Sequence, residues 1–112
     1  MYGGYTFDFR SVRDVHEMQS VWNSIGPFEW KALDCDETGV YIIARDSGCN
    51  GRLRVDGEAP NYSLEIDFDV EPGLVEQTKS ALFATVFDRL LPAVGATNLR
   101  DTTQQPRPPG VC

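Results

Sequence analysis

The chain has 112 residues, which is enough for one domain with its own hydrophobic core and too few for two. Its formal charge of −7, from 17 acidic and 10 basic residues, argues against a nucleic-acid binder, because phosphate binding needs clustered lysine and arginine. No apolar run is long enough for a membrane span. The opening residues, MYGGYTFDFR, lack the charged start and apolar run of a secretory signal, so a cytoplasmic protein is expected.

The N-terminal quarter of the chain predicts a strand followed by a helix. Residues 5–10, YTFDFR, alternate aromatic and polar side chains, as a half-buried strand does. Ser11 is in position to cap a helix, and apolar residues then recur at helical spacing up to about Ser24. The pair Gly26-Pro27 ends this helix.

The middle of the chain is rich in strand patterns separated by turn residues. These strand segments are 28–34, 40–46, 51–56 and 62–71. A second helix is expected after Pro72 and should end near Pro92. Residues 95–101 are either a short edge strand or coil, and the proline-rich residues 102–112 are predicted to be a disordered tail.

These patterns predict an α+β fold formed by one globular domain over residues 1–101. We expect a two-layer sandwich of order β-α-β-β-β-α. Its mainly antiparallel sheet would have four strands, with a fifth possible at the edge, and both helices would cover one face. The other face would be open to solvent or to a partner.

The segment YSLEIDFDVE, residues 62–71, alternates strictly between apolar and polar residues. One face of this strand should therefore enter the core, while the other carries a row of carboxylates. Keeping apolar residues together leaves two registers for the preceding strand: Arg52 lies opposite Glu65 in one and opposite Asp67 in the other. In both registers the open face is a mosaic of acidic, basic and apolar side chains, the apolar ones being Leu33, Tyr41 and Ile43.

Few residues offer catalytic or metal-binding chemistry. The three cysteines contain no CxxC pair and are expected to be free thiols, and His16 is the only histidine. Two carboxylates on one strand face have a spacing compatible with glycoside hydrolysis, but most strands with two acids share it and a flat face does not raise a pKa. The acidic turn DCDE at 34–37 lacks the spacing of an EF-hand loop. We therefore expect no enzyme activity, no cofactor and no metal.

The runs FEW, DCDETGVYI, GRLRV and NYSLEIDF, followed by a helix ending in LLPAVGA, span about residues 28–96. In layout they resemble the small acidic immunity proteins of bacterial polymorphic toxin systems, whose toxins are delivered by contact-dependent inhibition or type VI secretion. This resemblance implies an inhibitor that binds a cognate protein toxin and occludes its active site. An acidic surface would complement a basic active site.

The residues predicted to contact such a partner lie on two segments. On the strand and its end they are Asp67, Asp69 and Glu71; on the preceding hairpin they are Asp34, Asp36, Glu37 and Tyr41. Three other functions remain open. They are an acidic mimic of nucleic acid, a self-associating module that pairs through the apolar part of the open face, and a small carboxylate-dependent hydrolase.

Overall fold

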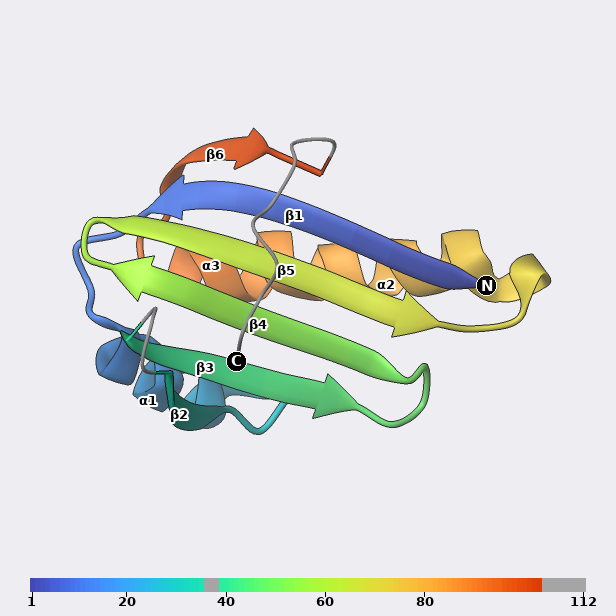
Figure 1. Ribbon diagram of the computed structural model, residues 1–112, viewed down its shortest axis with the longest axis horizontal. Coiled ribbons are helices and arrows are strands. Elements are labelled where there is room, and N and C mark those ends of the chain that lie inside the picture. The colour runs from blue at the N-terminus through green and yellow to red at the C-terminus, as the bar shows by residue number, and fades with distance from the viewer. Residues whose placement is uncertain (36–38, 104–112) are drawn as a thin grey trace.

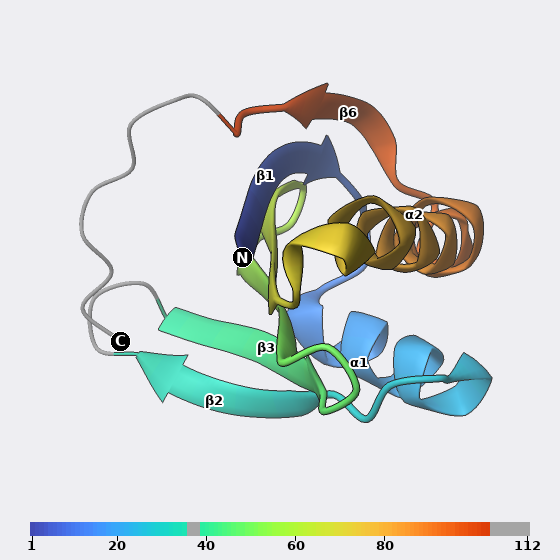
Figure 2. The ribbon, with the colours of Figure 1, turned by 90° about the vertical axis from the view of Figure 1, so that its right-hand side faces the viewer.

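The computed structural model describes residues 1–35 and 39–103. Its six strands form one sheet of order β2-β3-β4-β5-β1-β6, in which every neighbouring pair is antiparallel. The strands are β1 (Tyr2–Arg10), β2 (Lys31–Cys35), β3 (Gly39–Asp46), β4 (Gly51–Glu58), β5 (Asn61–Asp69) and β6 (Thr97–Asp101). The helices lie on one side of this sheet (Figures 1 and 2).

The fold is α+β, but the expected four-stranded sheet and the order β-α-β-β-β-α are wrong. The expected order leaves out one of the four strand segments named between the two main helices, all of which form strands, and β6 follows the second helix. Residues 95–101, which the sequence left open between an edge strand and coil, contain β6. The sequence does not decide between the two because all five β6 side chains are exposed and its backbone pairs only with β1. Without a buried face, such an edge strand shows no hydrophobic alternation.

Strand β1 begins at Tyr2, three residues before the predicted start. Gly3 and Gly4 obscure this extension, because glycine is usually depleted in strands. At Gly3 the reason is packing: a Cβ atom there would lie 2.5 Å from the Cζ atom of Phe68 on β5. The missing side chain lets the Phe68 ring cover the backbone of β1, and the two strands stay in register over residues 2–10.

Helix α1 (Val15–Ile25) is capped by Asp14 and not by the predicted Ser11. The Asp14 carboxylate accepts a hydrogen bond from the backbone N–H of Glu17 at 2.8 Å, and Glu17 accepts one from the Asp14 N–H, which forms a capping box. Ser11 is buried and instead donates to the carbonyl of Val94 at 2.6 Å. Ser11 therefore joins the end of β1 to the end of the second helix.

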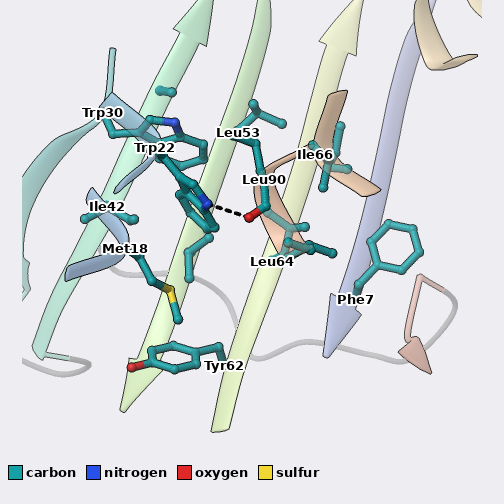
Figure 3. Packing of buried hydrophobic residues seen from close by; sticks show 14 of the residues in the cluster. Phe7, Met18, Trp22, Trp30, Ile42, Leu53, Tyr62, Leu64, Ile66 and Leu90 are labelled. Carbon is teal, nitrogen blue, oxygen red and sulfur yellow. Dashed lines mark hydrogen bonds between the residues drawn. The ribbon is translucent and has the colours of Figure 1, made fainter. Parts of the chain in front are cut away.

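The second helix starts with a short 3₁₀ turn, η1 (Pro72–Leu74), and runs through three continuous segments. These are α2 (Val75–Thr85), the π-helical turn η2 (Val86–Leu90) and α3 (Leu91–Ala93). At the end of the π turn the Leu90 carbonyl accepts a hydrogen bond from the indole N–H of Trp22 on α1, at 2.7 Å (Figure 3). Both groups are buried, so this bond satisfies two polar groups inside the core.

The hydrophobic core fills the space between the helices and one face of the sheet. Its largest fully buried side chains are Trp22, Trp30, Phe9, Phe68 and Met18. Asn23 binds the backbone of Trp30 on both sides, accepting from its N–H at 2.6 Å and donating to its carbonyl at 3.1 Å. These bonds hold the two indole rings 4.7 Å apart and fix the approach of the chain to β2.

The pairing of β4 with β5 follows the second of the two predicted registers. Arg52 lies opposite Asp67, and Arg54 lies opposite Glu65. Ala32 on β2 lies opposite Ile42 on β3, which in turn lies opposite Val55 on β4. Both registers bury apolar residues equally well, so hydrophobicity alone does not separate them.

The cysteines differ from one another. Cys49 is a buried free thiol, whereas Cys35 is disulfide-bonded, so the expectation of three free thiols was wrong for Cys35. Among the described residues, no helix is long and apolar enough to cross a membrane.

The first residues of the predicted tail are hydrogen-bonded to β1. The Thr102 backbone N–H donates to the carbonyl of Thr6 at 2.8 Å, and the Thr102 hydroxyl donates to the Thr6 hydroxyl at 3.1 Å. Residues 104–112, which make up the rest of that tail, lie outside the described residues.

Candidate functional site: an acidic corner beside an exposed tyrosine

The open face of the sheet carries a network of carboxylates neutralised by arginine. Arg52 on β4 contacts Asp67 at 2.8 Å and Glu65 at 3.3 Å, both on β5. Asp67 also accepts a hydrogen bond of 2.6 Å from the hydroxyl of Tyr2 on β1, and its side chain is only 16% exposed. Asp67 therefore serves mainly to join three strands, and its charge is largely compensated within the molecule.

The Tyr2 hydroxyl responds to this network. Its hydrogen bond to Asp67, together with partial burial and the carboxylate's charge, raises the pKa of Tyr2 from 10.0 to about 12. The neutral phenol is thus favoured in the folded protein, and its stabilising contribution is complete below pH 10 and lost as the pH rises through about 12.

We expect the difference in tyrosinate absorbance between the wild type and Tyr2→Phe to show one group titrating at about pH 12. Asp67→Asn, which removes the charge next to the hydroxyl, should bring this midpoint back towards 10. A wild-type Tyr2 that titrates near its ordinary pKa would contradict the hydrogen bond.

The surface where β1 starts and β5 ends differs in composition from the arginine–carboxylate network around Arg52. Here Tyr2 lies opposite Asp69, Met1 pairs through its backbone with Val70, and the chain turns at Glu71 into the second helix. Figure 1 shows the N-terminus beside the end of β5 and this turn. We call this surface the β1–β5 corner, and define it by Met1, Tyr2, Asp67, Asp69, Glu71 and Leu74.

The corner combines exposed apolar groups with acids. Tyr2 is 67% exposed and Leu74 is 42% exposed, values that are high for large apolar side chains. Asp69 contacts the N-terminal ammonium of Met1 at 3.1 Å. Among the described residues, no lysine or arginine forms an ion pair with Asp69 or Glu71. Glu71 therefore presents a carboxylate without an ion pair among the described residues, and Asp69 presents one that it shares with the N-terminal ammonium, beside an accessible aromatic ring.

The structure separates the predicted contact residues into groups. Asp67, Asp69 and Glu71 come together at the corner. Tyr41 lies on β3, two strands away from β5, and is only 9% exposed. Asp34 on β2 is exposed but points to the helix side of the sheet, because it neighbours Leu33, which shares the open face with Tyr41. Asp36 and Glu37 lie outside the described residues.

Tyr41 takes part in a packed cluster on the open face. The guanidinium of Arg54 lies 3.9 Å from the centre of the Tyr41 ring, in cation–π geometry. The same guanidinium donates to both carboxylate oxygens of Asp56 at 3.0–3.1 Å. Ring, guanidinium and carboxylate thus stabilise one another, and Tyr41 offers little area to a partner or to a second copy of the chain.

Sequence reasoning missed the apolar part of the corner. Tyr2 lies outside the predicted strand, so its pairing with Asp69 was not foreseen, and nothing in the sequence sets Leu74 apart as an exposed residue. The sequence did contain one signal. Tyr2, Thr6 and Asp8 all occupy even-numbered positions, which form the solvent-facing side of β1, so the strand alternation extends through Gly3 and Gly4 to Tyr2.

The described surface carries neither a grouped set of metal ligands nor an unbroken row of carboxylates. No three histidine, cysteine, aspartate or glutamate side chains within residues 1–35 and 39–103 are grouped to hold a metal ion. Arg52 interrupts the carboxylate row, so the regular negative spacing of a nucleic-acid mimic does not develop on β5. Searches against protein-family models and against curated proteins find no match to this chain.

Proposed function

We propose that this protein is an inhibitor of the immunity type, which binds a cognate protein toxin through the β1–β5 corner and occludes the toxin's active site. The observation that carries this proposal is the exposed Tyr2 ring beside Asp69 and Glu71, two acids without an arginine or lysine partner among the described residues. The resemblance in layout to small acidic immunity proteins supports the same class.

The composition of the corner fits a binding surface. Tyrosine is enriched among residues that dominate binding energy, because it buries a large rigid area and keeps a polar end. Met1, next to Tyr2 in the chain, and Leu74, in the turn that follows β5, are further exposed apolar side chains. Carboxylates at the rim of an interface speed association with a basic partner. The net charge of −7 adds a long-range attraction to the same kind of partner.

Charge reversal at the corner tests this assignment. The wild-type chain is immobilised to capture its partner from the source cells, and the partner is identified by mass spectrometry and purified. We expect Asp69→Lys combined with Glu71→Lys to weaken its binding by about 10–100-fold, mainly through a slower association rate. The matched control is Glu58→Lys combined with Asp88→Lys, which makes the same charge change at exposed acids elsewhere and should bind like the wild type apart from a small general loss.

The captured protein also has to be a toxin. Its expression should stop cell growth, co-expression of the wild-type chain should restore growth, and the corner double variant should not. Equal affinity of the two double variants would exclude the corner as the contact surface. A captured partner that is harmless to cells would exclude the immunity function while leaving the interface in place.

A further inference from the structure

A second surface lies at the opposite end of the β1–β5 pair. It is an open hollow of about 790 Å³ on the sheet, lined among others by Asp8, Arg10, Asp56, Asn61, Asn98 and Arg100. Tyr2 and Arg10 are eight residues apart on β1, so about 26 Å separates the corner from this hollow. The two surfaces lie on the same pair of strands but share no residue.

The two carboxylates that line the hollow differ in how far an arginine compensates their charge. Asp56 is held by the Arg54 guanidinium through hydrogen bonds of 3.0–3.1 Å, and its charge is compensated. Asp8 meets Arg100 on β6 at 3.6 Å, with the two side chains 46% and 67% exposed. An ion pair this long and this exposed contributes little, so Arg100 is available to a better acceptor.

Arg10 adds a second guanidinium to the same hollow. It lies two residues after Asp8 on β1, and therefore on the same face of the sheet. Among the described residues it forms no ion pair. The charged side chains that line the hollow are two arginines and two aspartates, and Arg54 from outside the lining compensates the charge of Asp56. Within the lining, Arg10 and Arg100 are therefore opposed mainly by the carboxylate of Asp8.

We propose that this hollow binds a small organic ligand through a phosphate or carboxylate group held by Arg10 and Arg100. Paired guanidiniums suit such oxyanions because each offers planar N–H donors. The side-chain amides of Asn61 and Asn98 would hydrogen-bond the polar body of the ligand. The volume of the hollow falls within the range of small-molecule sites.

The test is a titration of the ¹⁵N-labelled full chain with three probes: inorganic phosphate, citrate and adenosine monophosphate. Phosphate alone reports a bare anion site, citrate a carboxylate ligand, and the nucleotide a phosphate carried on a larger body. We expect saturable shifts of the amide signals of Asn61 and Asn98 with at least one probe. Arg10→Gln and Arg100→Gln should each lower the affinity for that probe by about 10-fold. Arg45→Gln, a matched change at an exposed arginine outside the hollow, should leave this affinity unchanged.

Two results would overturn the proposal. One is the absence of saturable shifts with all three probes at concentrations up to about 10 mM, which would saturate a site with a dissociation constant of about 1 mM. The other is an equal loss in the Arg45 variant, which would indicate a general charge effect. Circular dichroism confirms that each variant is folded. The corner variants should bind the probes normally, so either proposal can fail without the other.

Discussion

Replacing Trp22 with alanine should lower the free energy of unfolding by about 3–5 kcal/mol, as large aromatic truncations in cores do. Trp22 is 1% exposed, packs at 4.7 Å against the Trp30 ring, and donates the 2.7 Å hydrogen bond to Leu90. Truncation would leave a cavity between α1 and the sheet, and would also leave the Leu90 carbonyl buried without its donor. Urea denaturation followed by far-ultraviolet circular dichroism measures the loss without relying on tryptophan fluorescence.

Trp22→Phe separates the two contributions. It retains much of the ring and loses the indole N–H, so the expected cost falls to about 1–3 kcal/mol, the range for an unsatisfied buried polar group. If alanine and phenylalanine cost the same, the hydrogen bond alone would account for the effect. A loss below about 1 kcal/mol for Trp22→Ala would mean that the site collapses, contrary to the close packing of the two indole rings.

Gly57→Ala should destabilise the protein by about 1–3 kcal/mol or more. Gly57 lies near the end of β4 with φ of 124°, a conformation that residues with a side chain rarely adopt. A Cβ atom there would lie 2.4 Å from the carbonyl oxygen of Asn61, which belongs to the paired strand and cannot move independently. The β4–β5 hairpin would have to distort to admit the methyl group.

Gly73→Ala is the matched control for this substitution. Gly73 does not have a positive φ, and a Cβ atom added there would meet no other atom within 4 Å. Alanine there should be neutral or stabilise by up to about 1 kcal/mol, through the reduced freedom of the unfolded chain. Denaturation midpoints of the two variants, measured side by side, check both expectations. Equal stability would show that the strain at Gly57 is relieved locally.

The segments that could be predicted from the sequence are those that bury one face. β3, β4 and β5 alternate clearly, and the spacing of apolar residues located both main helices. What could not be predicted depends on partners far along the chain. The start of β1 at Tyr2 depends on the Phe68 ring lying over Gly3, and β6 is held by backbone bonds to β1 with no buried side chain of its own.

The candidate site shows the same division. The end of β5 was predicted to carry acids, and Asp67, Asp69 and Glu71 do lie there. Their different environments follow from contacts that a single sequence does not encode locally: Asp67 is tied to Arg52 and Tyr2, whereas Asp69 is not. The prediction groups Asp34 with Tyr41 because the two are near in sequence, but strand alternation puts them on opposite faces.

The position of β1 in the sheet has a consequence for the order of folding. Strands β2 to β5 follow one another along the chain as antiparallel neighbours, so their contacts close short loops. β1 pairs with β5 only across about 60 residues, which carries a larger loop-closure cost and places this pairing late. The β1–β5 corner lies at one end of that late pairing, where β1 starts and β5 ends. A nascent or partly unfolded chain therefore lacks this surface, so only a completely folded chain would bind a partner at the corner.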